Sequence, residues 1–229
     1  MKTILITGAS DGIGKSIAIK LSKENNKLIL FGRDEEKLKV VKADCNANGS
    51  EASIYAFDLT DFTKLRETVE SIASSQPIDV LINNAGIWQK AGDLTSISPE
   101  KIQEILNTNL TCHILLTRQL LDQMRNREDT AIINVISKSG TVAQIGQSVY
   151  TASKFGMKGF TDVLREDTKS EPIRVAAVYQ SGTHTDMFKK AGEEFSLDRF
   201  TEPDDLADVI AFMLSRPKKI WLNEVHITY

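Results

Sequence analysis

The feature that most constrains the fold is a regular alternation of short apolar runs with longer segments of helical periodicity. Runs such as Ile4–Ile6, Leu28–Leu30 and Val80–Ile82 are apolar throughout, which is typical of strands covered on both faces. Strands that alternate with helices along a chain form parallel sheets with crossover helices. We therefore expect an α/β fold: a doubly wound parallel sheet in three layers, with helices on both faces.

The expected strands lie at residues 2–7, 27–32, 53–57, 78–83, 130–136, 172–179 and 219–227. The expected helices lie at residues 12–24, 34–47, 61–75, 99–127, 148–170 and 202–215. Ser98 and Pro99 are a typical helix start, because serine caps free amides and proline fits the first helical position. No linker or repeat divides the chain, so residues 1–229 are expected to form one domain.

Two long connections, 137–149 and 183–201, follow expected strands. Connections of this length in a compact domain are usually functional. We expect residues 183–201 to form a loop or lid over a substrate. The alternative is that its charged pairs, Lys189–Lys190 and Glu193–Glu194, belong to a solvated face.

Composition excludes several classes of function. The formal net charge is −3, from 28 basic and 31 acidic residues without a basic stripe, so nucleic acid is not an expected partner. The apolar runs are far shorter than the roughly 20 residues that cross a bilayer, and strand 2–7 follows the initiator directly. We expect no membrane contact and a cytoplasmic location. Cys45 and Cys112 lack C-x-x-C spacing, which predicts reduced thiols and no metal site.

Three glycines, Gly8, Gly12 and Gly14, stand between strand 2–7 and the helix that follows. A tight turn that brings backbone close to a pyrophosphate excludes a Cβ, and the helix N-terminus supplies free N–H donors and positive partial charge. The spacing is G-x-x-x-G-x-G rather than G-x-G-x-x-G. A flexible strand-to-helix loop is the alternative interpretation.

Tyr150 and Lys154 are four residues apart on an expected helix, so they share one helix face. A tyrosine near pKa 10 is a poor acid or base at neutral pH, and a nearby cation favours phenolate. We therefore expect Lys154 to bring the pKa of Tyr150 toward the working range. The alternative is a surface pair, because this spacing occurs by chance in many helices.

The motifs T-G-x-x-x-G-x-G from Thr7, N-N-A-G from Asn83 and S-x12-Y-x3-K from Ser137 follow one another along nearly the whole chain. In this order they resemble the short-chain dehydrogenase/reductase family. The resemblance implies a Rossmann-type fold and an oxidoreductase that moves a hydride between NADP(H) and a small carbonyl or secondary alcohol. A cofactor-binding regulatory or scaffolding protein without turnover is the alternative.

The resemblance also implies roles for individual residues. Tyr150 would exchange a proton with the substrate oxygen, Ser137 would hydrogen-bond that oxygen with Ser139 as its rival, and Lys154 would contact the nicotinamide ribose. Asn109 would hold a proton-relay water, or it is a buried amide with satisfied hydrogen bonds. Cofactor contacts are implied for Gly8, Ser10, Asp11, Gly12, Ile13, Gly14, Arg33, Asp58, Leu59, Asn84, Ala85, Gly86, Tyr150, Lys154, Thr183 and Thr185.

The choice between NADP(H) and NAD(H) depends on the end of strand 27–32. An acidic residue there would accept from both ribose hydroxyls and repel a 2′-phosphate, but this position is Gly32, followed by Arg33. We expect NADP(H), with NAD(H) as the alternative if Asp34 turns inward instead of Arg33. The alternative for Arg33 itself is a solvated charge paired with Asp34 or Glu35. Asp58 resembles the residue that binds the adenine amino group, or it caps helix 61–75.

Two departures from the family pattern stand near the end of the chain. Gln180–Ser181 replaces the usual Pro-Gly turn, and the segment from Lys219 lacks the glycine-rich tail of acyl-carrier-protein ketoreductases, which lowers the weight of that substrate class. The resemblance further implies a homodimer or homotetramer, formed through the long helices near 99–127 and 148–170.

Overall fold

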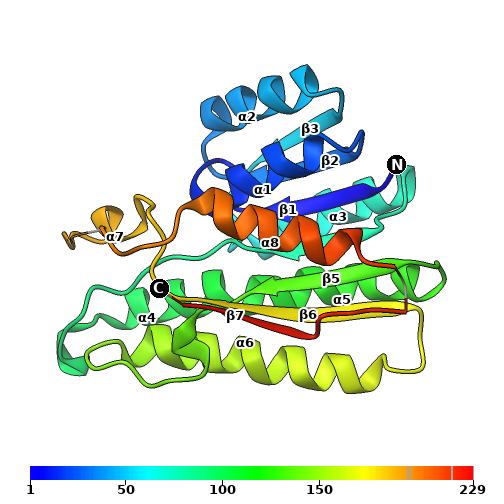
Figure 1. The fold of residues 1–229 in the computed structure, drawn as a ribbon. Coiled ribbons are helices and arrows are strands. Elements are labelled where there is room, and N and C mark those ends of the chain that lie inside the picture. Colours follow the sequence, from blue (N-terminus) through cyan, green and yellow to red (C-terminus); the bar gives the residue numbers. More distant parts are fainter. Residues whose placement is uncertain (195, 197, 218, 229) are drawn as a thin grey trace.

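The computed structural model describes residues 1–194, 196, 198–217 and 219–228, and seven strands form one sheet in it (Figure 1). The strand order is β3-β2-β1-β4-β5-β6-β7, and every pairing is parallel. Each connection between neighbours must therefore cross a face of the sheet. The strands are β1 (Thr3–Thr7), β2 (Lys27–Gly32), β3 (Glu51–Ala56), β4 (Val80–Asn83), β5 (Thr130–Val135), β6 (Ile173–Gln180) and β7 (Glu224–Ile227).

Helices cover both faces of this sheet, which confirms the expected three-layer α/β fold (Figure 1). One face packs against α1 (Gly12–Ser22), α2 (Glu35–Ala47) and α8 (Pro203–Ser215). The other packs against α3 (Phe62–Ser75), α5 (Cys112–Arg125) and α6 (Ser148–Asp167). The helix α4 (Pro99–Leu106) precedes α5, and the short α7 (Met187–Lys190) stands apart beyond the carboxyl ends of the strands.

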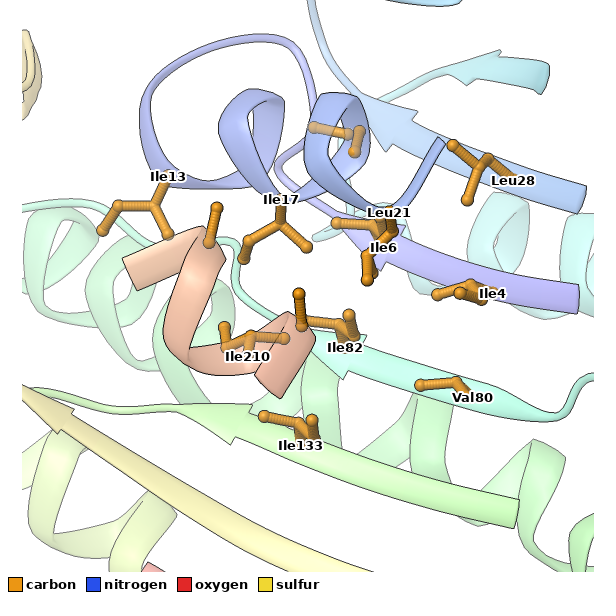
Figure 2. Packing of buried hydrophobic residues seen from close by; sticks show 14 of the residues in the cluster. Ile4, Ile6, Ile13, Ile17, Leu21, Leu28, Val80, Ile82, Ile133 and Ile210 are labelled. Atoms are coloured by element: carbon orange, nitrogen blue, oxygen red, sulfur yellow. The ribbon is translucent and has the colours of Figure 1, made fainter. Parts of the chain in front are cut away.

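The alternation of side chains along β1 explains the two apolar cores. Ile4 and Ile6 belong to the core beneath α1 and α8, whereas Leu5 belongs to the core on the other face. All three are at most 1% exposed, as expected of a central strand covered twice. Figure 2 shows Ile17 of α1 and Ile210 of α8 in the same core as the strand side chains Ile6 and Ile82.

The last expected strand, 219–227, begins too early, because β7 starts at Glu224. Trp221 donates from its indole nitrogen to the backbone oxygen of Val175 at 3.0 Å, and the Arg174 guanidinium lies 4.5 Å from its ring. Side-chain packing against β6 therefore takes the place of a strand ladder at this residue. The expected strand 53–57 begins too late, since Glu51 already pairs with Lys27.

The expected helix 99–127 is also interrupted. A π turn at Asn107–Thr111 separates α4 from α5. Ser98 accepts from the Lys101 amide at 3.2 Å and Pro99 occupies the first turn, so the expected helix start is confirmed. Single π turns inside helices are frequent at functional sites, and this one contains the fully buried Asn109.

The sheet topology fixes where a ligand can enter. From β1 the chain builds β2 and β3 on one side, then returns to place β4 on the other side of β1. The loops that leave β1 and β4 therefore diverge and leave a crevice at the carboxyl ends of these strands.

Candidate active site

A cavity of about 760 Å³ lies at the carboxyl ends of the strands, where the loops after β1 and β4 diverge. Gly14 and Asn109 are the two sequence-predicted site residues that do not line it. The others line it together: Gly8, Ser10, Asp11, Gly12, Ile13, Arg33, Asp58, Leu59, Asn84, Ala85, Gly86, Ser137, Tyr150, Lys154, Thr183 and Thr185.

The glycine-rich turn after β1 needs glycine for two different reasons. Gly8 and Gly12 have φ of +67° and +51°, in the left-handed region that L side chains rarely adopt. Gly14 has no room, because a Cβ there would lie 2.2 Å from the backbone oxygen of Gly8. Gly14 thus contributes close packing behind the cavity. The Asp11 side chain makes no cap bond to α1, so this helix N-terminus keeps free amides for an anionic group.

The asparagine turn after β4 is tied to the end of β1. Thr7 Oγ1 accepts from the backbone amides of Asn84 at 2.9 Å and Ala85 at 3.0 Å. Asn84 Nδ2 donates to the backbone oxygen of Thr7 at 2.9 Å. His113 of α5 also contacts this turn, with one ring nitrogen 2.8 Å from the backbone oxygen of Ala85 and the other 3.2 Å from Asn83 Oδ1. Burial lowers the pKa of His113 to about 4, so the ring is neutral at pH 7.

At the end of β2, Arg33 is exposed and its guanidinium is 3.9 Å from Asp58. Asp34 accepts from the Lys37 amide at 3.0 Å and caps α2, so its carboxylate serves the helix. Lys37 brings a second cation to the cavity wall, 3.2 Å from Asp11.

Asp58 is not the cap of α3, which was the alternative interpretation of this residue. Asp61 takes that place and accepts from the Lys64 amide at 3.0 Å. Asp58 instead accepts from the amide and the hydroxyl of Thr60, both at 2.8 Å. Its carboxylate therefore stays at the cavity wall.

Ser137, Tyr150 and Lys154 come together on the cavity wall beside β5 and α6. All three are at most 8% exposed. Lys154 Nζ lies 5.7 Å from the centroid of the Tyr150 ring. The rival Ser139 also lines the cavity, and its amide donates to Ser137 Oγ at 3.1 Å. The buried pair contradicts the alternative of a surface Tyr–Lys pair.

The expected lowering of the Tyr150 pKa is wrong for this structure. Burial raises the pKa of Tyr150 to about 12, and the nearby Ser137 hydroxyl opposes that rise. Burial also lowers the pKa of Lys154 to about 8. Desolvation disfavours the charged form of both groups and is the largest influence on each pKa. At pH 7 the tyrosine is therefore a neutral phenol and the lysine is mostly protonated.

Asn109 lies behind this group rather than in the cavity. Its side chain accepts from the Ile87 amide at 2.8 Å and donates to the Ile87 oxygen at 2.9 Å and to Ser153 Oγ at 3.2 Å. Both donor hydrogens are thus engaged, as in the alternative of a satisfied buried amide. Asn109 is thus hydrogen-bonded to Ser153, the residue immediately before Lys154.

The turn after β6 is held without the usual Pro-Gly pair. The Ser181 amide donates to Ile227 of β7 at 2.9 Å, and the Thr201 amide donates to Gly182 at 3.2 Å. Thr183 pairs with Thr201 in an isolated parallel bridge. Gln180 lines the cavity, and its Oε1 is buried without a hydrogen-bond partner among the described residues.

The segment after this turn crosses the cavity mouth. Phe195 and Leu197, within the expected lid 183–201, lie outside the described residues. Lys190 donates to Asp11, and Glu193 accepts from the Trp88 indole and from the Ala91 amide at 2.7 Å. Trp88 in turn packs against Tyr150, with ring centroids 4.6 Å apart. The charged side chains of this segment thus bind both walls of the cavity.

Sequence reasoning missed three residues that shape the site: Lys37, Gln89 and His113. Lys37 could have been found, because it stands four residues after Arg33, in the first turn of the expected helix 34–47. The other two act through contacts to distant segments. In the described part of the chain, no three His, Cys, Asp or Glu side chains gather as a metal site would need. No described helix has the length and apolar character to span a bilayer.

This chain is similar to known relatives and solved structures over most of their length. The chain is 30% identical over 223 residues to a 3-oxoacyl-(acyl-carrier-protein) reductase of Rickettsia bellii, covering 94% of this chain and 90% of that protein. It is 30% identical over 225 residues to an acetoacetyl-CoA reductase of Shinella zoogloeoides, covering 93% and 91%. A short-chain dehydrogenase from Sphingobium yanoikuyae in complex with NADPH superposes with a TM-score of 0.90 at 28% identity, covering 99% and 87%.

A metagenomic short-chain oxidoreductase in complex with NADP superposes with a TM-score of 0.85 at 28% identity, covering 100% of this chain and 97% of that one. A reductase from Brucella melitensis in complex with NAD has the same fold, with a TM-score of 0.87 at 23% identity, covering 98% and 94%. The model of the short chain dehydrogenase family matches residues 2–195. The chain therefore belongs to the short-chain dehydrogenase/reductase family of NAD(P)-dependent oxidoreductases.

Proposed function

We propose that this oxidoreductase uses NADP(H) to interconvert a small carbonyl compound and its secondary alcohol, with Tyr150, Ser137 and Lys154 as its catalytic residues. The observation that carries the proposal is that Ser137, Tyr150 and Lys154 are buried together on the wall of one cavity that begins at the glycine-rich turn. When bound, the nicotinamide supplies or accepts the hydride. The residues described below hold the reactants and move the proton.

The cradle for the cofactor is built where a side chain would not fit. A Cβ on Gly8 would lie 2.9 Å from Ala85, and one on Gly32 would lie 3.2 Å from Ser10. Backbone amides at the start of α1 offer donors to a pyrophosphate. Asp58 and Leu59 would hold the adenine end, Asn84 to Gly86 the central part, and Thr183 and Thr185 the carboxamide.

The proton chemistry follows from the protonation states. In reduction, neutral Tyr150 donates its phenolic proton to the developing alkoxide, and the Ser137 hydroxyl hydrogen-bonds the same oxygen. Protonated Lys154 stabilises the phenolate that Tyr150 becomes, because the two groups share a site of low dielectric. In oxidation the same groups act in reverse. The buried pair and its shared cavity support this assignment.

The preference for NADP(H) is supported by two cations at the end of β2. Arg33 and Lys37 line the cavity, and Gly32 stands where an acidic residue would repel a 2′-phosphate. Measuring Michaelis constants for NADPH and NADH tests this, and we expect the lower value for NADPH. Arg33→Ala should raise the constant for NADPH about tenfold and leave that for NADH unchanged. Arg66→Ala, an exposed arginine of α3, is the matched control.

Equal Michaelis constants for the two cofactors, or an Arg33→Ala variant that raises both constants alike, would contradict the preference for NADP(H) and favour NAD(H).

The substrate requires a separate screen. NADPH consumption should be followed with aldehydes, ketones and dicarbonyls, and with acetoacetyl thioesters because the similar relatives carry thioester reductase names. Binding of NADPH without consumption across this panel would favour the alternative of a regulatory or scaffolding protein.

We further propose that residues 183–201 cover the substrate and that the chain is a homodimer or homotetramer in the cytoplasm. The contacts of Lys190 and Glu193 to both cavity walls support the lid. Exposed Phe155 and Val163 on α6, 44% and 61% exposed, support association through this helix. Light scattering of the purified protein tests the oligomeric state, and a monomer at micromolar concentration would contradict it.

A further inference from the structure

Gln89 is a buried polar residue that the catalytic assignment does not use. It stands in the loop after β4, and its side chain is 2% exposed. Its Oε1 accepts from the backbone amides of Val149 at 2.9 Å and Tyr150 at 2.8 Å, and its Nε2 donates to the Gly146 oxygen at 3.0 Å. One side chain thus closes the N-terminus of α6, sixty residues further along the chain.

The start of α6 needs such a partner. Its N-cap residue, Gln147, makes no side-chain bond to the first turn, so the free amides of that turn depend on groups from elsewhere. Gly146 has φ of +75° and also accepts from the Gly92 amide at 3.0 Å. The loop around Gln89 is therefore joined to the first turn of α6 at Val149 and Tyr150, and to the segment before α6 at Gly146.

The same loop reaches the two other parts of the site. At its beginning, Ile87 is held through both backbone groups by Asn109. Next to Gln89, the Trp88 ring packs on the Tyr150 ring. Tyr150 is therefore fixed by this loop at its backbone, through Gln89, and at its ring, through Trp88. The asparagine turn of the proposed cofactor site leads directly into this loop.

We propose that Gln89 is a positioning residue, which sets how Tyr150 enters the cavity by holding the backbone amide of Tyr150 to the loop after β4. The proposal rests on the proposed role of Tyr150 in proton transfer. A small displacement of a catalytic group is expected to reduce turnover strongly, because proton transfer needs hydrogen-bond distance. Cofactor binding at the glycine-rich turn needs no such precision at α6.

The test compares three variants with the wild-type protein. Gln89→Met keeps the length of the side chain and removes its hydrogen bonds. Gln89→Glu keeps an oxygen that can accept from Val149 and Tyr150 and loses only the bond that Nε2 donates to the Gly146 oxygen. Asp61→Ala is the control, because it removes the cap of α3, a helix outside the cavity lining. For each, kcat, KM for the carbonyl substrate, and NADPH binding by fluorescence are measured below the unfolding temperature.

We expect Gln89→Met to lower kcat by about 10- to 100-fold while NADPH affinity changes less than about twofold. Gln89→Glu should recover kcat to within about threefold of wild type, and Asp61→Ala should leave kcat unchanged while it lowers stability. A folded Gln89→Met variant with wild-type kcat, or a Gln89→Glu variant as impaired as Gln89→Met, would overturn the proposal. Should Gln89→Met not fold, Gln89→Asn, whose amide is one methylene short, replaces it under the same criteria.

These outcomes are separate from failure of the proposed function. If the wild-type protein reduces no carbonyl, the proposed function fails before Gln89 is examined. If wild type turns over and Gln89→Met turns over equally well, only the positioning role fails.

Discussion

Alanine at Gly14 and at Gly159 should change stability in opposite directions. Both glycines lie in helices, α1 and α6, where alanine normally stabilises by about 0.5–1 kcal/mol. Within a single chain, a Cβ on Gly159 would meet nothing within 4 Å. Gly159 lies on the same α6 face as Phe155 and Val163, so the expected gain applies to the monomer, and unfolding is measured at a concentration where the chain is monomeric. A Cβ on Gly14 would lie 2.2 Å from the Gly8 oxygen and 2.6 Å from Asn84 Nδ2, closer than real Cβ contacts.

The Gly14→Ala variant must therefore displace the glycine-rich turn or the asparagine turn. Overpacking of this kind costs about 1–3 kcal/mol. Moving Asn84 also weakens its 2.9 Å hydrogen bond to the backbone oxygen of Thr7. A bond of this kind contributes about 1 kcal/mol to the free energy of unfolding. After the helix-propensity gain is deducted, we expect a net loss of about 1–3 kcal/mol of unfolding free energy.

Urea unfolding followed by far-ultraviolet circular dichroism, at one protein concentration, measures both variants. The midpoint should fall for Gly14→Ala and rise for Gly159→Ala. Because the displaced turn belongs to the proposed cofactor site, added NADPH should stabilise Gly14→Ala less than wild type. If Gly14→Ala is as stable as Gly159→Ala and gains as much from NADPH, the close packing of the two turns is refuted.

Three further predictions concern the site and its support. Since burial lowers the pKa of Lys154 to about 8 and raises that of Tyr150 to about 12, both are protonated below pH 8, and kcat/KM for reduction should fall as pH rises through about 8; a flat profile to pH 10 would contradict this. Thr7→Val leaves the amides of Asn84 and Ala85 without their acceptor, so urea unfolding should show a loss of about 2 kcal/mol and titration a weaker affinity for NADPH. Ile210→Ala should cost about 2–5 kcal/mol in the same unfolding assay with kcat unchanged, and a loss below about 1 kcal/mol would argue against its buried position.

The architecture could be predicted from the sequence because runs such as Ile4–Ile6 are apolar at every position, as in strands buried on both faces. They are also too short to be helices. The segment 219–223 misled the same reasoning, since Trp221 is apolar like a strand residue yet packs through its side chain against β6. The π turn at Asn107–Thr111 was also missed, because helical periodicity hardly changes over one turn.

Some site residues could be predicted from the sequence and others could not. Tyr150 and Lys154 belong to a local motif, and they line the same cavity as Ser137, as the motif implies. The predicted direction of the Tyr150 pKa shift was wrong, because the spacing reveals the neighbouring cation but not the burial that raises this pKa. Gln89 and His113 were missed because their hydrogen bonds join segments far apart in the chain, and a lone glutamine or histidine carries no signal of such a contact.

The central claim is that Tyr150 moves the proton in a carbonyl reduction driven by NADPH. Its most direct test is a single-turnover measurement of NADPH oxidation with an accepted carbonyl substrate, comparing wild type with Tyr150→Phe after NADPH binding has been measured for both. We predict equal NADPH affinity and a loss of turnover of at least about 100-fold in the variant. A Tyr150→Phe protein that oxidises NADPH at the wild-type rate would contradict the account.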